Sequence, residues 1–166
     1  GGPLEDMSRD EGLQYFREGL MEVKDHARDR GVKILIEPEP DLLVENSTQF
    51  LELFQDLDHQ VFGINFDVGH FYCVNEDPIQ LIRTMKDCIY HFHLEDIAMT
   101  RKHHHLMLGH GGIDLAAVLN SIDEIGYDGF VTVELYTYEH VPKEAAQGAM
   151  AYLKKWRKQN PSPGIG

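Results

Sequence analysis

The chain has 166 residues, a formal net charge of −13 at pH 7, 42% hydrophobic residues and 26% charged residues. This composition is ordinary for one globular domain with a buried core, and it excludes the disordered class. The negative charge disfavours a nucleic-acid partner, because a polyanion would be repelled. No apolar run approaches the roughly 20 residues that a membrane span needs, so we expect no membrane partner. The two cysteines, Cys73 and Cys88, are too few for a disulfide framework and predict a cytoplasmic location.

Helical and strand patterns alternate along the chain. Ser8 and Glu11 have the spacing of a capping box, and they begin a helical pattern that runs to Gly31. A strand follows at 32–38. Further helices are expected to begin at 47 or 48, at 77, at 114 and near 143, with further strands at 61–67, 88–94 and 130–135. Because no hairpin signal separates the strands, this order predicts a parallel sheet with helical crossovers, either an open doubly wound sheet or part of a β/α barrel.

The predicted strands end in residues that bind metals. In a parallel sheet the carboxyl ends of the strands line one face, and barrels build their sites on that face. Several carboxylates converging there would repel one another unless a cation lay between them, and carboxylates with one imidazole suit Mn²⁺, Mg²⁺ or Co²⁺ better than a structural zinc site. The strand-end residues are Glu37, Asp67 with His70, His93 and Glu134.

Five short motifs at these strand ends, or in the loops behind them, resemble a known family between residues 32 and 136. The motifs are E-P at Glu37, D-x-G-H at Asp67, H-x-x-D from His93 to Asp96, H-x-x-x-G-x-G at His105, Gly109 and Gly111, and V-x-V-E at Glu134. Together they resemble the C-terminal half of the xylose-isomerase-like TIM barrels, which are sugar and sugar-phosphate isomerases and epimerases that share their fold with endonuclease IV.

The resemblance implies an α/β fold of the (β/α)8 TIM-barrel type, with residues 1–166 as one domain of about four β/α units. It implies an enzyme, a metal-dependent isomerase or epimerase that moves a proton through an enediolate of a sugar or sugar phosphate. Glu37 and Glu134 would exchange the proton, His70 and His105 would bind substrate, and Arg101 would contact a phosphate. One divalent metal, first Mn²⁺ with Mg²⁺, Co²⁺ or Zn²⁺ as alternatives, would be bound by Glu37, Asp67, His93 and Glu134.

Several neighbouring residues leave alternatives open. Glu39 is a rival to Glu37, and His91 faces the same side of its strand as His93 and is a rival for the metal. We expect His103 and His104 to lie in a solvated loop. The tyrosines at 136 and 138 are expected either to border the pocket or to pack.

Two other functions remain alternatives to the isomerase. One is an endonuclease IV-like phosphodiesterase, in which His70, His103 and His105 would bind additional zinc. The other is a non-catalytic barrel fragment or binding module. Because four parallel strands cannot close a barrel of eight, we expect a homo-oligomer or pairing with a missing N-terminal half. Residues 159–166 are predicted to form a flexible tail.

Overall fold

The computed structural model describes residues 2, 4 and 6–161 of the chain. A four-stranded sheet, in which every neighbouring pair is parallel, has the strand order β1-β2-β3-β6. Its strands are β1 (Ile34–Ile36), β2 (Phe62–Asp67), β3 (Ile89–Leu94) and β6 (Val131–Val133). The α/β class and the parallel sheet predicted from the sequence are therefore confirmed.

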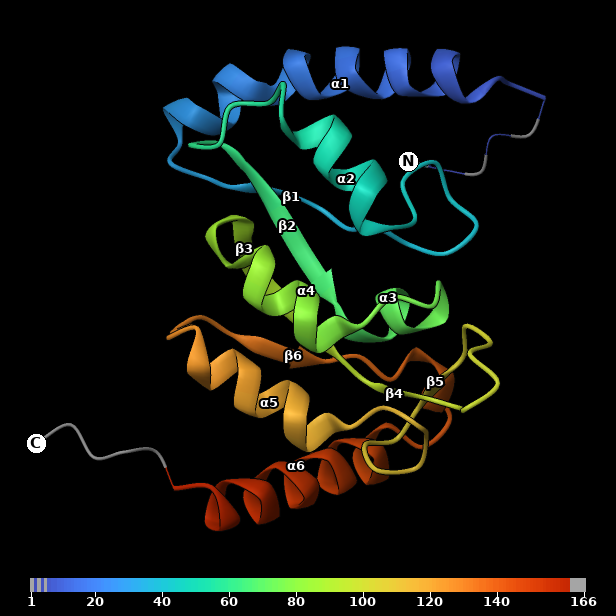
Figure 1. Ribbon diagram of the computed structural model, residues 1–166, viewed down its shortest axis with the longest axis vertical. Coiled ribbons are helices and arrows are strands. Elements are labelled where there is room, and N and C mark those ends of the chain that lie inside the picture. The colour runs from blue at the N-terminus through green and yellow to red at the C-terminus, as the bar shows by residue number, and fades with distance from the viewer. Residues whose placement is uncertain (1, 3, 5, 162–166) are drawn as a thin grey trace, which may run out of the picture.

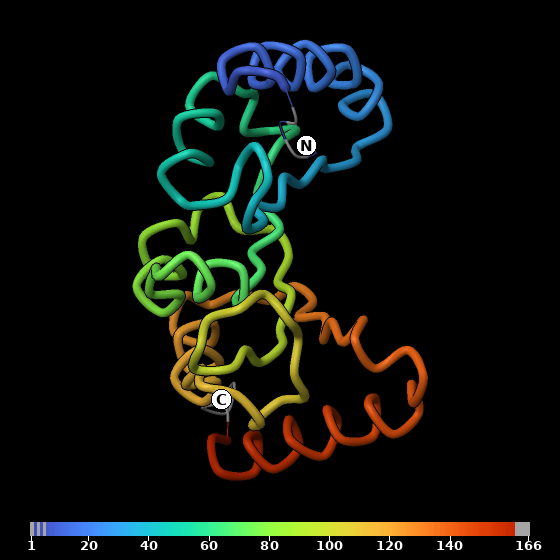
Figure 2. Tube along the Cα trace, turned by 90° about the vertical axis from the view of Figure 1, so that its right-hand side faces the viewer, coloured from blue at the N-terminus to red at the C-terminus, as the bar shows by residue number. Residues whose placement is uncertain are grey.

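The helices connect and cover these strands. The first and last helices, α1 and α6, lie at opposite ends of the long axis of the molecule (Figures 1 and 2). The helices are α1 (Arg9–Asp29), α2 (Ser47–Phe54), α3 (Val68–Cys73), α4 (Pro78–Thr84), α5 (Leu115–Glu124) and α6 (Pro142–Gln159), with 3₁₀ turns η1 (Lys86–Cys88) and η2 (Tyr136–Tyr138). Among the described residues, no helix combines the length and the apolarity needed to cross a membrane.

Local sequence signals explain where the helices begin. The capping box predicted at α1 is present, since the Ser8 side chain accepts the Glu11 N–H and the Glu11 carboxylate accepts the Ser8 N–H. Asp77 caps α4, and Pro78 occupies its first turn, where a missing N–H costs nothing.

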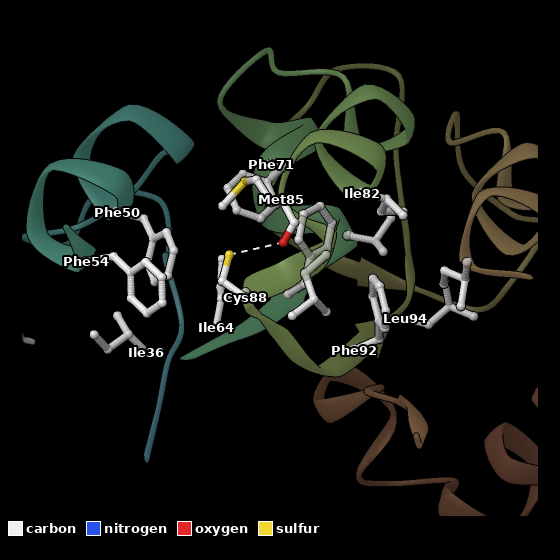
Figure 3. Packing of buried hydrophobic residues seen from close by; sticks show 14 of the residues in the cluster. Ile36, Phe50, Phe54, Ile64, Phe71, Ile82, Met85, Cys88, Phe92 and Leu94 are labelled. Atoms are coloured by element: carbon white, nitrogen blue, oxygen red, sulfur yellow. Dashed lines mark hydrogen bonds between the residues drawn. The ribbon is translucent and has the colours of Figure 1, made fainter. Parts of the chain in front are cut away.

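The hydrophobic core lies between the sheet and its helices. All six residues of β2 are buried, as expected for a central strand covered on both faces. Phe50 and Phe54 of α2 pack next to Ile36 of β1, while Phe92 and Leu94 of β3 continue the core toward the C-terminal elements (Figure 3). The alternation of β3 therefore directs Phe92 and Leu94 into the core and leaves His91 and His93 on the other side.

Two features of the structure differ from the sequence expectation. Residues 68–73 form the short helix α3, whereas no helix was predicted directly after the second strand. The long loop after β3 contains a small antiparallel ladder between β4 (Asp96–Ile97) and β5 (His105–Leu106). The predicted tail begins inside α6, which ends at Gln159, and its residues 162–166 lie outside the described part of the chain.

Candidate active site

The four predicted metal ligands meet at the carboxyl end of the sheet. Glu37 follows β1, Asp67 ends β2, His93 lies in β3 and Glu134 follows β6. Each offers one ligand atom, and these atoms all lie within 4.8 Å of one another. The Nδ1 atom of His93 lies 2.9 Å from Glu37 Oε1, 3.2 Å from Glu134 Oε2 and 3.9 Å from Asp67 Oδ2. Parallel strands bring these residues together because they end at the same edge of the sheet.

A buried, unpartnered oxygen indicates that this group fits a cation. Asp67 is fully buried, and its Oδ1 accepts the His70 N–H at 2.8 Å, which caps α3. Its Oδ2 has no hydrogen-bond partner among the described residues. Burial raises the pKa of Asp67, and the nearby carboxylates of Glu37 and Glu134 raise it further. A divalent cation would balance this charge, and three carboxylates with one imidazole are a suitable donor set.

The histidine and one glutamate of the group are electrostatically coupled. The hydrogen bond with Glu37 is the main reason why the pKa of His93 is raised, although burial opposes it. For Glu37, burial raises the pKa, but the hydrogen bond and the charge of His93 outweigh burial, so the pKa is lowered overall. Glu37 is therefore ionised at neutral pH and able to act as a base or a ligand.

Three further histidines form one wall of the site. Ring nitrogens of His70, His103 and His105 lie within 4.8 Å of one another. The Nδ1 atoms of His70 and His105 donate to the carbonyl oxygens of Pro38 at 2.9 Å and of Glu134 at 3.0 Å, which leaves each Nε2 with a lone pair. Burial lowers the pKa of His70 and of His105 to about 4. Both rings are therefore neutral at pH 7 and can accept hydrogen bonds from hydroxyl groups.

We expect the neutral histidines to make the fold sensitive to acid. Their pKa is lower in the folded state than in the unfolded chain, so the unfolded chain binds more protons between pH 6.5 and 4, and stability falls as the pH falls. At pH 5 each buried ring should cost on the order of 2 kcal/mol. Urea unfolding at pH 7 and pH 5 should show a smaller acid-induced loss for His105→Gln than for the wild type. The exposed neighbour provides the control His104→Gln, and an equal loss in all three proteins would contradict the expectation.

A cavity of about 180 Å³ lies between the metal-ligand group and the histidine wall. Tyr136 borders it and packs on His105 with ring centroids 4.6 Å apart. Glu39 borders it as well, so both of the predicted rivals Glu37 and Glu39 reach the same space. The lining residues are Glu37, Glu39, His70, His103, His105, Glu134 and Tyr136.

Three neighbouring residues neither line the cavity nor belong to the metal-ligand group. Arg101 is not brought to the cavity, because its guanidinium donates to the Tyr72 carbonyl oxygen and lies 3.9 Å from the centre of the Tyr72 ring. His91 lies beside His93 but donates to or accepts from Thr132 Oγ1 at 2.9 Å and is outside the metal-ligand group. His104 is exposed, as predicted.

His103 lies in the loop, as predicted, but its ring is only partly exposed and faces the site, which the prediction of a solvated residue did not include. Its ring packs edge-on against His70 with centroids 4.6 Å apart and lies 5.3 Å from the His105 ring. Its Nε2 is buried without a hydrogen-bond partner among the described residues. This packing joins a loop to two separate elements, which periodicity along the chain does not reveal.

Sequence reasoning also missed Glu95, which is fully buried next to Asp67. Burial raises the pKa of Glu95, and the adjacent Asp67 raises it further. Its Oε1 accepts the N–H of Gly69, while its Oε2 has no hydrogen-bond partner in the described part of the chain. A signal was present, since Glu95 continues the every-second-residue pattern of His91 and His93 into the site.

Asp96 anchors the loop that carries His103 and His105 of the histidine wall. Its buried carboxylate accepts the N–H groups of Gly109 at 3.0 Å, Gly111 at 2.8 Å and Ile113 at 3.2 Å. A Cβ atom at Gly111 would overlap Asp96 Oδ1 and the Ile97 carbonyl oxygen, so glycine allows this close approach.

We expect Asp96→Asn to destabilise the fold by on the order of 2 kcal/mol, because an amide retains only one acceptor oxygen and leaves buried N–H groups unpaired. Urea unfolding measures this loss, and limited proteolysis should show earlier cleavage between residues 97 and 113. The exposed turn residue Asp128 provides the control Asp128→Asn. A variant as stable and as resistant as the control would show that Asp96 does not anchor the loop.

Known proteins resemble this chain in both sequence and fold. An inosose isomerase of Bacillus licheniformis is 28% identical over 137 residues, which cover 78% of this chain and 49% of that protein. The structure of a D-tagatose 3-epimerase-like protein is 27% identical, with a TM-score of 0.67, and covers 85% of this chain and 57% of that one. The structure of the IolI protein with a bound zinc atom is 25% identical, with a TM-score of 0.75, and covers 92% of this chain and 59% of that one.

This chain spans about half the length of the curated relatives that it matches. Its sequence matches the family described as "Xylose isomerase-like TIM barrel" over residues 1–156, which is almost the whole chain. The match covers every strand of the sheet and every residue of the metal-ligand group. The chain therefore belongs to the xylose isomerase-like TIM barrel family.

Proposed function

We propose that this chain carries the proton-transfer site of a metal-dependent isomerase or epimerase that acts on a sugar or a related polyhydroxy ketone. One observation carries the proposal: Glu37 and Glu134 follow the two edge strands, border the same cavity, and both lie within 3.2 Å of His93 Nδ1. Two carboxylates that face one small polar cavity can act on the same substrate carbon. The names of the relatives, an inosose isomerase and a D-tagatose 3-epimerase-like protein, support the same class of substrate.

A divalent metal would be held by the group Glu37, Asp67, His93 and Glu134. When bound, it would supply Lewis-acid polarisation of a substrate carbonyl, which acidifies the neighbouring C–H bond. The carboxylate-rich donor set supports Mn²⁺ as the first choice, and the zinc in the related IolI structure makes Zn²⁺ the main alternative.

The residues of the chain then divide the work of moving the proton. Glu37, whose pKa is held low by His93, takes the proton from the carbon next to the carbonyl, which leaves an enediolate. Glu134, carrying a proton taken up from solvent, delivers that proton to the enediolate from the face opposite Glu37, and Glu37 afterwards releases its proton to solvent. Return to the same carbon inverts it and gives an epimer, whereas return to the neighbouring carbon gives the aldose or ketose isomer. His70 and His105 accept hydrogen bonds from substrate hydroxyls through Nε2 and hold the substrate in place.

A second candidate function is metal-dependent phosphodiester hydrolysis. The observation that favours it is the histidine wall, whose ring nitrogens lie within 4.8 Å of one another and could hold a further metal. The net charge of −13 opposes a nucleic-acid substrate, so we rank this function second.

We also propose that further β/α units complete the barrel, either from the same polypeptide or from another chain. Apolar grooves run along both edges of the sheet, one of about 410 Å³ between β6 and α6 and one of about 340 Å³ beside β1. A closed barrel of this type has eight strands, and the relatives are about twice as long.

The free cysteines Cys73 and Cys88 suit a reducing cytoplasm, where we place the reaction.

Deuterium exchange tests the proposed reaction. The purified protein is incubated in D₂O with Mn²⁺ and with D-tagatose or an inosose. Proton NMR then follows the loss of the signal of the C–H group next to the carbonyl. We expect exchange that stops when EDTA removes the metal. Metal-dependent hydrolysis of bis(p-nitrophenyl) phosphate with no exchange into any ketose would overturn the proposal in favour of the second candidate.

A further inference from the structure

We propose that Glu95 is a positioning residue of the metal centre, which fixes the D-V-G-H turn that presents Asp67 and His70. The inference rests on the proposed metal-dependent function. Glu95 directly follows β3, is fully buried and lies beside Asp67. Nothing in the D-V-G-H motif itself indicates that a residue 26 positions later holds it.

The ends of two paired strands explain why Glu95 meets this turn. Asp67 ends β2 opposite His93 of β3, so the first turn of α3 after Asp67 lies next to Glu95, which directly follows β3. There the Gly69 N–H donates to Glu95 Oε1. A Cβ atom at position 69 would overlap that same oxygen, so the turn and the carboxyl group are fitted to each other. Glu95 thus holds the backbone between Asp67 and His70.

The Glu95 carboxyl group also interacts directly with the Asp67 side chain. Neither Glu95 Oε2 nor Asp67 Oδ2 has a hydrogen-bond donor among the described residues. Glu95 therefore contacts the Asp67 side chain as well as the backbone two residues after it. Both contacts restrict the orientation of Asp67, and outer residues of this kind typically alter metal affinity 10- to 100-fold.

Glu95 adjoins the group centred on His93 but does not belong to it. The group of possible ligand atoms that includes Glu95 also contains Asp67, His105 and Glu134, but it contains neither Glu37 nor His93. The group centred on His93 in turn does not include Glu95. Glu95 is therefore not among the ligand atoms gathered around His93, which suits a residue that orients a ligand.

Binding of Mn²⁺ alone and of Zn²⁺ alone to the 166-residue chain, measured by isothermal titration calorimetry, tests the inference without any activity assay. Glu95→Gln keeps an acceptor for Gly69 and offers an N–H to Asp67, so its metal affinity should stay within threefold of the wild type. Glu95→Leu loses both contacts and should bind at least tenfold more weakly. Thermal unfolding of each protein shows whether the chain is folded. If the leucine variant does not fold, Glu95→Asp, which is one methylene shorter, should weaken binding at least fivefold.

Two outcomes would overturn the positioning role. Folded variants that all bind like the wild type would show that Glu95 serves packing alone, and a glutamine variant as weak as the leucine variant would show that Glu95 binds the metal directly. Each leaves the proposed metal centre standing. A wild-type chain that binds neither metal would overturn the proposed function itself, and this inference with it.

Discussion

Glu134→Gln is expected to lower the rate of deuterium exchange into the substrate by about 10³-fold, since a positioned acid or base typically contributes 10²- to 10⁴-fold to such a step. The amide can still approach the site next to His93, but it cannot carry a proton. Glu37→Gln should have a similar effect, because its carboxylate lies at a comparable distance, 2.9 Å against 3.2 Å, from the same nitrogen.

The exchange rate should be measured at saturating Mn²⁺, so that a weaker metal affinity is separated from the loss of proton transfer. Glu22 provides the matched control Glu22→Gln, because it is exposed on α1 and far along the chain from the site. A Glu134→Gln protein that retains more than one tenth of the wild-type rate would exclude Glu134 from proton transfer.

Asp67→Asn is expected to change metal affinity and metal-free stability in opposite directions. Affinity for Mn²⁺ should fall by about 10²-fold or more, because a buried anionic ligand is lost. The metal-free protein should become more stable at pH 8, by about 1 kcal/mol. Since the pKa of Asp67 is raised in the fold, the folded state binds more protons than the unfolded chain above the ordinary carboxyl pKa, and ionised Asp67 costs stability.

Thermal unfolding at pH 8 with and without Mn²⁺ measures both effects. Without metal the variant should melt at the higher temperature, and with saturating metal the wild type should melt higher, because only its folded state binds the ion tightly. The exposed Asp128→Asn protein is the control and should follow the wild type in both conditions. An Asp67→Asn protein that is less stable than the wild type in both conditions would indicate that Asp67 serves the fold and not a metal.

Much of the site could be predicted because it depends on strand ends. Glu37, Asp67, His93 and Glu134 each lie at or just after the carboxyl end of a strand, and parallel pairing alone brings such residues to one edge. The α/β class followed from the alternation of helical and strand periods. Whether these residues bind a metal stays a prediction.

The loop after β3 could not be predicted in the same way. Arg101 has a positive φ of 58° and turns toward Tyr72, while His103 packs against rings from α3 and β5. The loop is held by hydrogen bonds from three distant N–H groups to Asp96, which no local propensity encodes. Glu95 differs from these residues, because it continues the alternation of His91 and His93 one residue beyond the end of β3.

Native mass spectrometry of the 166-residue chain with added Mn²⁺ tests the central claim most directly, because it counts the metal ions on each chain and reports the assembly in the same spectrum. The proposed site predicts one Mn²⁺ per wild-type chain and none on Asp67→Asn at the same metal concentration. A wild-type chain that takes up no metal, or an Asp67→Asn chain that takes up as much as the wild type, would contradict a metal centre built on Glu37, Asp67, His93 and Glu134.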